Sequence, residues 1–489
     1  MSESLASPVA RLQTLLGVWR RTGPQVTCTK APLLLNEAPA VIGMMTVVIG
    51  NGGSLDRAIR DVAANGPRLS AGLFKTIVDD ADTRVEADMK MALTRLITAL
   101  PEGTAGFRMA LHMVISAAEA TDRDERTRML RDASDVALAG LKEAGKMYSA
   151  SLNAPCMAIF GLGIMVPMVL MSILPMLSIG GLFGPSTISL GQIMAVTLVI
   201  VPAGVVTVIL SVKQRNPFMS SAPGDRDVRC ALPMSVAAPL LLLFLCAGMA
   251  PVTALCLALA GAGALCFAIR YSVYRQEAAR ERQAMLLEDS VFEMGNRLVS
   301  GDSFEDALVR SVATRGECSR LAECLRRELD ICRGDVPTAI RLALDSVSPA
   351  VAEMICGIHR AAVKDLRDAG RLALSVGRQM QDQEAVRRAI RADLKGMTDT
   401  MFGTASVFAP LVLGMSVSML APLSRLSSAV DFSGTSLILA AYLTELCVLM
   451  AALMSFLDGR TGLRDIVRRF SLMLPVAMIV FILCTQIAF

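Results

Sequence analysis

Long stretches of the chain carry no charged side chain, and they alternate with strongly polar stretches. Four runs of 66, 40, 25 and 20 residues contain no Asp, Glu, Lys or Arg. They lie at 147–212, 230–269, 400–424 and 470–489. A helix that crosses the hydrocarbon core of a bilayer needs about 20 apolar residues. The two longer runs are therefore expected to hold two spans each, and the two shorter runs one each.

One further apolar stretch, 436–457, contains a carboxylate, Glu445, and brings the number of predicted spans to seven. The spans are roughly 155–177, 191–212, 233–249, 252–270, 402–422, 436–457 and 471–488. A buried soluble core is a poor explanation, because such a core seldom uses charge-free runs beyond about 18 residues.

Lysine and arginine in the short loops predict which side of the membrane each loop faces. The loops after the second span and before the seventh are basic, whereas loops 178–190 and 423–435 are nearly free of charge. We expect the basic loops in the cytoplasm, with the N-terminus inside and the C-terminus outside. The basic residues of the two loops are Lys213, Arg215, Arg226, Arg229, Arg460, Arg464, Arg468 and Arg469.

The two polar regions, about 31–150 and 272–401, both show helical periodicity and resemble each other. In each, a glycine-containing turn and a serine precede a short amphipathic helix, and a leucine-striped helix follows. Residues match at a nearly fixed offset: Ala58 and Ala307 at 249, Pro101 and Pro349 at 248, His112 and His359 at 247, and Pro175 and Pro422 at 247. Several matches at one offset predict a duplicated unit. The span count gives both copies the same orientation, so the repeat is parallel rather than inverted.

The predicted fold is an all-α polytopic membrane protein with two homologous cytoplasmic helical-bundle domains. The predicted segments are an N-terminal segment (1–30), helical domain 1 (31–150), spans 1–2 (151–213), a basic loop (214–231), spans 3–4 (232–271), helical domain 2 (272–401) and spans 5–7 (402–489). In the N-terminal segment, Leu12, Leu15, Leu16 and Trp19 form an apolar face. Two interpretations stay open: an interfacial helix, or a helix packed on the first domain.

The composition and the motifs of the chain predict no catalytic site. There is no G-x-x-x-x-G-K-[ST] and no G-x-S-x-G motif, so we predict no phosphate-binding loop and no hydrolase nucleophile. The only two histidines, His112 and His359, lie in different repeats and are interpreted as packing residues, and no metal or cofactor is predicted. The twelve cysteines show no C-x-x-C, and those in the second domain should remain reduced thiols. The net charge of +4 reflects cytoplasmic loops, so it does not indicate nucleic-acid binding.

Two features of the spans are candidates for function. Glu445 lies inside a predicted span, where a charge is costly; it is either functional or a protonated or paired structural group. The stretch Ala260-Gly261-Ala262-Gly263-Ala264 predicts close helix packing or homodimerisation.

Basic residues gather at the predicted cytoplasmic edge and are candidates for docking a partner protein. The positive-inside rule and contact with lipid headgroups are the alternative explanation. The candidate docking residues are Lys213, Arg215, Arg387, Arg388, Arg391, Lys395, Arg464, Arg468 and Arg469.

The duplicated pattern of glycine turn, short helix, leucine-striped helix and a long helix that continues into a span resembles a known family. In the two copies the short helix begins Ser54-Leu55-Asp56-Arg57-Ala58 and Ser303-Phe304-Glu305-Asp306-Ala307. This arrangement, over about 40–489, resembles the F-type platform proteins of type II secretion and type IV pilus machines. It is most similar to the archaeal members that serve archaella, pili or adhesins.

The resemblance implies a platform in the cytoplasmic membrane beneath a growing filament. A hexameric secretion ATPase would bind the cytoplasmic domains, and pilin-like subunits would leave the membrane to join the filament. On this view the chain is not itself an enzyme. A transporter or channel, and a scaffold that works without a motor, are the alternative functions; a transporter would need more polar residues in its spans than Glu445.

Overall fold

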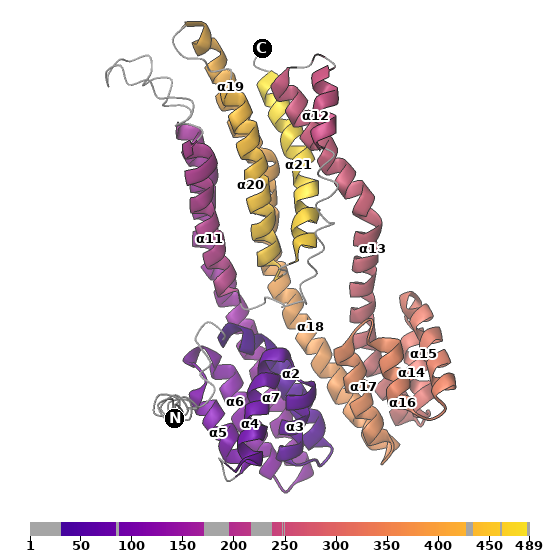
Figure 1. The fold of residues 1–489 in the computed structure, drawn as a ribbon. Coiled ribbons are helices and arrows are strands. Elements are labelled where there is room, and N and C mark those ends of the chain that lie inside the picture. Colours follow the sequence, from indigo (N-terminus) through magenta and orange to yellow (C-terminus); the bar gives the residue numbers. More distant parts are fainter. Residues whose placement is uncertain are drawn as a thin grey trace, which may run out of the picture. The chain divides into compact units, whose positions relative to one another are not determined.

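The computed structural model describes residues 31–84, 88–170, 195–216, 237–246, 248, 250–426, 434–459 and 462–486. Within these ranges the chain is helical and contains no strand, which confirms the all-α prediction (Figure 1). The candidate N-terminal helix, all of loop 178–190, residues 427–433 of loop 423–435, the basic residues Arg226, Arg229 and Arg460, and Pro175 lie outside the described residues.

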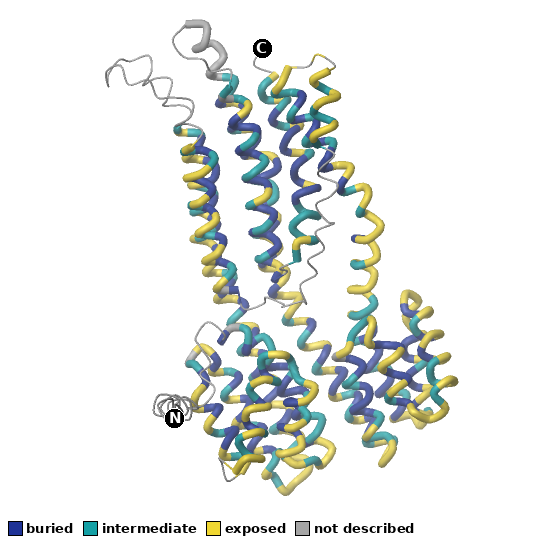
Figure 2. Tube along the Cα trace, in the orientation of Figure 1, coloured by how far each residue is buried: buried dark blue, intermediate teal, exposed yellow. Residues whose placement is uncertain are grey.

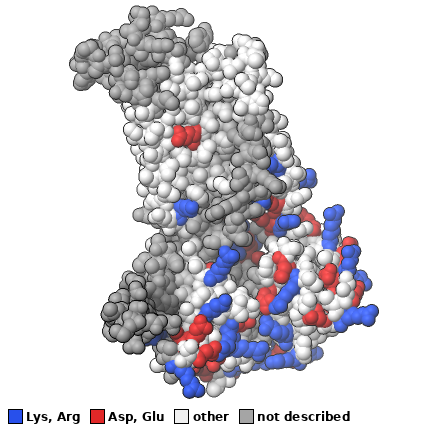
Figure 3. All heavy atoms as spheres, viewed as in Figure 1, with Lys and Arg blue, Asp and Glu red and all other residues white. Residues whose placement is uncertain are grey.

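The helices form two compact units. Unit 1 comprises Met1–Ala144 and Glu277–Arg388, and unit 2 comprises Gly145–Gln276 and Ala389–Phe489. The chain passes between the units within α7 (Arg123–Ser151), α13 (Pro251–Ser300) and α18 (Leu366–Gly403). On the visible face, charged side chains crowd the helices of unit 1 and are sparse on those of unit 2 (Figure 3).

The first half of unit 1 is a bundle around an apolar helix. Its helices are α2 (Ala31–Gly50), α3 (Leu55–Asn65), α4 (Arg68–Asp82), α5 (Met89–Ala99), a short 3-10 turn (Glu102–Thr104), α6 (Ala105–Glu119) and the start of α7. Ile42 and Met45 of α2 are fully buried in one core with Ile59, Leu93 and Leu111. The predicted short helix begins after Ser54, whose hydroxyl accepts from the Arg57 amide at 3.3 Å.

Helix α2 is long and apolar enough to cross a membrane, yet it carries a carboxylate that serves the bundle. Glu37 accepts hydrogen bonds from the Ser70 amide at 2.8 Å, the Ser70 hydroxyl at 2.6 Å and the Leu69 amide at 3.3 Å. These amides belong to the first turn of α4, whose own N-cap position is Pro67 and provides no side-chain cap. A carboxylate at a helix N-terminus satisfies free amides and complements the helix dipole.

The second half of unit 1 has its own core. Its helices are the end of α13, α14 (Phe304–Ala313), a 3-10 turn (Gly316–Cys318), α15 (Ser319–Cys332), α16 (Val336–Leu344), α17 (Pro349–Ala362) and the start of α18. Leu287 and Leu298 of α13 and Ala373 of α18 are buried among them. Ser303 caps α14 as Ser54 caps α3, accepting from the Asp306 amide at 3.3 Å.

The two halves of unit 1 touch through α2 and α18. The amides of Gln379 and Gln383 donate to the carbonyl oxygen of Pro39 at 3.4 and 3.2 Å. Val47 of α2 packs against the core of the second half. Arg123 and Asp368 form an ion pair of 3.0 Å at the surface. The end of α13, the start of α18 and α2 therefore belong to one packed assembly.

Unit 2 contains the apolar helices. They are α8 (Asn153–Phe160) with its continuation to Leu170, α11 (Val201–Arg215), α12 (Ala237–Cys246), the first part of α13, the end of α18, α19 (Ala409–Leu426), α20 (Thr435–Leu457) and α21 (Leu463–Gln486). Figure 2 shows many exposed residues along these helices, and a large share of them are apolar. Exposed apolar side chains are expected on helices that face lipid.

Seven helices of the described chain are long and apolar enough to cross a membrane, which indicates a multi-pass membrane protein. Six of them overlap the predicted spans other than 233–249. In that stretch the described helix is Ala237–Cys246, ten residues long, and the seventh helix by length and composition is Leu33–Gly50 in α2. Within unit 1, α2 packs its apolar side chains into the core, and Glu37 provides the N-terminal cap of α4.

The described parts of the spans contain three short π-helical segments, and each ends two residues before a proline. They are Gly161–Met165, Val196–Ile200 and Thr404–Phe408, followed by Pro167, Pro202 and Pro410. Proline has no amide hydrogen and clashes with the preceding turn, and a π-turn is one way for a membrane helix to adapt. At Pro167, Pro202 and Pro410 the helix therefore changes type locally and continues rather than ending.

The small-residue stretch of α13 packs within the chain. A Cβ atom added to Gly263 would lie 3.1 Å from the Pro475 ring of α21, and one added to Gly261 would lie 3.5 Å from Leu240 of α12. Close helix packing, one of the two expectations for this stretch, is thus met by α12 and α21. Homodimerisation through the same stretch stays a prediction.

Candidate functional site

Among the candidate docking residues whose side chains the structure describes, those of α18 are the most accessible. Arg387 and Arg388 end the part of α18 that belongs to unit 1, and Arg391 and Lys395 follow on the part that belongs to unit 2; all four are exposed. Arg388 also pairs with the carboxylate of the buried Glu384 at 3.6 Å. The side chains are presented to solvent because the opposite positions of the helix are apolar and buried.

Lys213 is half-buried in unit 2 and contacts an aromatic ring. Its ammonium group lies 5.0 Å from the centroid of the Phe456 ring, a cation–π contact between α11 and α20. The Asn216 amide donates to the Phe456 carbonyl oxygen next to it. Arg215 is the last residue of α11. This end of α11 is thus fixed against the end of α20, and Lys213 has a packing role that charge alone did not indicate.

The arginines at the start of α21 also have partners within unit 2. Arg468 pairs with Asp465 at 3.1 Å, and its guanidinium lies 5.8 Å from the centroid of the Tyr274 ring. Arg469 forms an ion pair with Asp458, and Arg464 is half-buried. Because these contacts fasten α21 to α13 and to the end of α20, their loss would disturb packing as well as any docking.

Glu445 lies at the middle of α20 and is half-buried. Tyr442, one turn earlier, is buried and donates its hydroxyl proton to the carbonyl oxygen of Gly163. The hydroxyl of Thr444 donates to the carbonyl oxygen of Ala440 at 2.9 Å. The polar side chains beside Glu445 on α20 are therefore satisfied by backbone groups.

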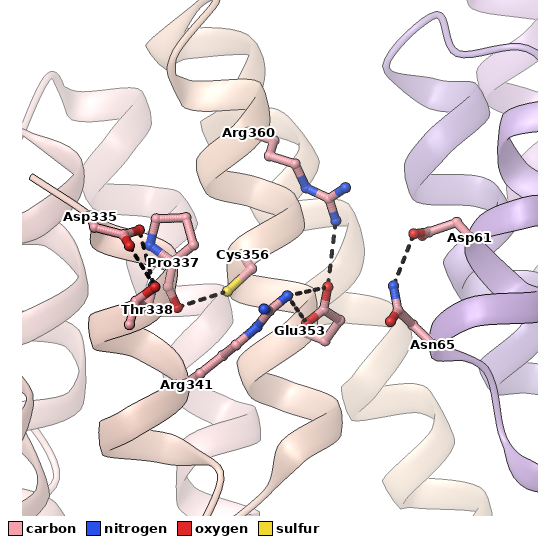
Figure 4. A network of polar contacts seen from close by, with 9 residues as sticks. All are labelled: Asp61, Asn65, Asp335, Pro337, Thr338, Arg341, Glu353, Cys356 and Arg360. Carbon is pink, nitrogen blue, oxygen red and sulfur yellow. Dashed lines mark hydrogen bonds and ion pairs between the residues drawn. The ribbon is translucent and has the colours of Figure 1, made fainter.

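A polar network between α16 and α17 was not indicated by any sequence motif (Figure 4). Glu353 accepts from Arg341 at 3.0 Å and pairs with Arg360 at 3.7 Å, and the Glu353 hydrogen bond raises the pKa of Arg341. Asp335 accepts from the Thr338 hydroxyl at 2.6 Å, which lowers the pKa of that carboxyl. The Arg341–Glu353 pair joins α16 to α17, whereas the other two contacts lie within α17 and at the start of α16. The exposure of the two arginines limits the contribution of their pairs to stability.

Cys356 lies within this network as an apolar group. Its thiol is buried, with the sulfur 3.7 Å from the Pro337 carbonyl oxygen, and burial raises its pKa to about 11. A thiol that stays protonated at neutral pH is a poor nucleophile. Cys356 is thus a small buried residue of the bundle, whereas Cys324 in the same half of unit 1 is exposed.

The two matched histidines occupy different environments. His359 lies against Phe304 with ring centroids 4.9 Å apart in an edge-on contact, and burial lowers its pKa. His112 is exposed and lines a shallow groove with Met109, Met113 and Met129. The interpretation of both as packing histidines is therefore wrong for His112, because position 112 of α6 faces away from the core that buries Leu111.

No cluster of three or more potential metal ligands occurs among the described residues. No family model, no curated protein and no solved structure matches the chain.

Proposed function

We propose that this chain is a membrane platform that couples a cytoplasmic secretion ATPase to the assembly of pilin-like filament subunits. The observation that carries the proposal is the course of α13 and α18. Each helix contributes to the core of the unit 1 bundle at one end and to the apolar helices of unit 2 at the other. A protein that binds unit 1 thus acts on helices that continue into the membrane-spanning segments.

Matched local features of the two halves support the proposed parallel repeat. Ser54 and Ser303 cap the helices that follow them through the same 3.3 Å hydrogen bond. The glycines before them, Gly52 and Gly301, both have positive φ angles, of 75° and 103°. The π-helical segments 161–165 and 404–408 lie 243 residues apart, close to the offset of the sequence matches. A duplicated unit accounts for all three correspondences.

In the proposed arrangement unit 1 and the N-terminus lie in the cytoplasm, and the C-terminus lies outside the cell membrane. The basic loops support this orientation through the positive-inside rule. Anionic lipid headgroups would meet the residues around Lys213 and Arg468, where the positive charges are already held by aromatic rings. We assign ATPase docking first to α18, because its arginines are exposed on the outside of the helix.

The test is binding of the purified chain to a hexameric secretion ATPase from the same cell. It is measured by co-purification and by titrating the ATPase over the immobilised chain. Reversing the charges of Arg388 and Arg391 to glutamate should weaken binding by at least about tenfold, because two favourable contacts become repulsive. Undiminished binding by that double variant would remove α18 from the docking surface.

The matched control reverses Arg320 and Arg327, which are exposed on α15. This control changes the net charge by the same amount, so a loss of binding confined to the α18 variant is specific to that helix. If only the α15 variant loses binding, the docking surface lies there and the α18 assignment is wrong. If the unaltered chain binds no secretion ATPase, the platform proposal itself fails.

A further inference from the structure

Helix α20 is the most buried of the candidate spans in the described chain, and it leaves a narrow stripe uncovered. Leu437 and Val448 are 43% and 41% exposed, and Ala441, Glu445 and Ala452 between and beyond them are half-buried. The spacings of four, four, three and four residues place these five on one side of a helix. The stripe, defined by these five residues, has two alanines with Glu445 between them.

The carboxylate of this stripe lies at mid-depth. Glu445 comes ten residues after the start of α20 at Thr435 and twelve before its end at Leu457. A helix rises about 1.5 Å per residue, so both ends lie about 15 to 18 Å away. This is half the thickness of a bilayer core, the depth at which a carboxylate is least favourable without a partner.

Glu445 has no hydrogen-bond or ion-pair partner among the described residues. Its nearest polar neighbours along α20 are occupied, because Tyr442 donates to Gly163 and Thr444 donates to Ala440. Intramembrane carboxylates normally face a bundle interior or pair with another polar group. Glu445 instead lies half-buried on the α20 stripe, between the exposed Leu437 and Val448.

We propose that the α20 stripe docks a single transmembrane helix of a partner protein that carries an ammonium or guanidinium group at mid-depth. The pairing would keep Glu445 ionised and supply its missing partner. Ala441 and Ala452 would allow close approach of the two helices, as small residues do in membrane interfaces. The inference does not depend on the platform function, and its failure would leave ATPase binding untouched.

The partner is not a second copy of this chain. No lysine or arginine lies within the seven predicted spans short of their cytoplasmic ends, so a second copy offers no cation at the depth of Glu445. Two copies of the α20 stripe would bring two carboxylates together, and like charges at close range oppose association.

The experiment reconstitutes the full chain in phosphatidylcholine vesicles with a synthetic helix of leucine and alanine that has one central lysine. A photoreactive benzoyl-phenylalanine replaces Val448 on the stripe, and the yield of covalent adduct is measured. We expect the lysine peptide to be captured about three to thirty times more than the same peptide with a central leucine. The matched control places the photoreactive residue at Leu210 of α11, which is 48% exposed, where both peptides should be captured equally.

Glu445→Gln keeps the shape of the side chain and should abolish the preference for lysine. A Glu445→Lys variant should instead capture a peptide with a central glutamate more than the lysine peptide. Because a misfolded chain would show no such preference, this variant separates the loss of charge pairing from the loss of folding. Capture of the lysine peptide that is unchanged in Glu445→Gln would overturn the proposal. So would equal capture of the lysine and leucine peptides at Val448, or adducts formed chiefly between two copies of the chain.

Discussion

The hydroxyl of Tyr442 donates a hydrogen bond to the carbonyl oxygen of Gly163, joining residues 279 positions apart. Gly163 lies in the π-helical segment before Pro167, and Tyr442 lies on the buried side of α20. Phe160, beside the same segment, contacts Phe408 of the third π-helical segment with ring centroids 5.7 Å apart. The irregular turns of these two spans are thus packed together, with Tyr442 fastened to one of them.

Tyr442→Phe should lower the stability of unit 2 by about 0.6 to 1.7 kcal/mol, the range for side-chain hydrogen bonds within membranes. The phenyl ring keeps the packing, so the change isolates the hydroxyl. The measurement is thermal unfolding of the chain in detergent. Tyr271→Phe is the control, because Tyr271 is 55% exposed, and it should leave the midpoint unchanged. Equal midpoints for Tyr442→Phe and the unaltered chain would contradict a structural role for this bond.

Substituting alanine for Gly414 of α19 and for Gly403 at the end of α18 should change stability in opposite directions. A Cβ atom at Gly414 would lie 2.7 Å from the Cβ of Cys484, so Gly414→Ala should force α19 and α21 apart and cost about 1 to 3 kcal/mol. Gly403 has nothing within 4 Å of such an atom, and alanine there should stabilise by about 0.4 to 1 kcal/mol. The same unfolding assay ranks the two variants; a stable Gly414→Ala variant would show that this helix contact is loose.

The charge-free runs predicted six spans, because a bilayer imposes a length and a composition on each helix. Five of them overlap helices long and apolar enough to cross a membrane, whereas the described helix in 233–249 has only ten residues. Helix α2 shows the limit of that argument. Its apolar residues satisfy the same criterion, but its function in unit 1 depends on Glu37 reaching α4, a contact with no sequence signature. The π-helical segments could not be predicted either. The sequence shows Pro167, Pro202 and Pro410, but the local change of helix type depends on how neighbouring helices pack around it.

Basic residues show why candidate sites were harder to predict than spans. From charge alone, Lys213, Arg468 and Arg388 were equivalent candidates for docking. In the structure Lys213 and Arg468 contact aromatic rings, whereas Arg388 is exposed on α18 with only a loose pair to Glu384. The difference arises from residues far away in the sequence, Phe456 and Tyr274. Helical periodicity reports only on residues of one helix, so it does not predict such pairs.

Glu37→Gln should destabilise unit 1 although Glu37 lies in an apolar helix. The carboxylate accepts from two amides and a hydroxyl of the α4 N-terminus, and an amide offers only one acceptor oxygen and no charge for the helix dipole. We expect a loss of about 1 to 2 kcal/mol, the size of a lost helix cap. Hydrogen exchange of the α4 amides is the direct measurement.

The control for that change is Glu119→Gln, which removes an exposed carboxylate that pairs with Lys90 at the surface. Exposed pairs contribute little, so exchange in α4 and overall stability should be nearly unaffected. If Glu37→Gln leaves the protection of Leu69 and Ser70 unchanged, the cap is supplied by another group and the assignment of α2 as a structural helix of unit 1 loses its main polar support.

His359 should make the stability of the second half of unit 1 depend on pH. Burial against Phe304 lowers its pKa, while Glu305 and Asp335 act in the opposite sense. Because the folded pKa lies below the unfolded value of about 6.5, the contribution is complete above that pH. It is lost as the pH falls from the unfolded pKa through the folded one, since the unfolded chain then binds the proton more readily.

His359→Gln should therefore flatten the fall in unfolding midpoint between pH 7 and pH 5, measured by thermal unfolding in detergent across that range. His112→Gln provides the matched control, because it makes the same substitution at an exposed histidine in the other half of unit 1. A slope that changes with His112 and not with His359 would show that the edge-on contact with Phe304 does not favour the neutral ring. A slope that changes with neither would place the acid sensitivity of unit 1 in its carboxylates, with Asp335 the first to examine because its bond to Thr338 favours ionisation.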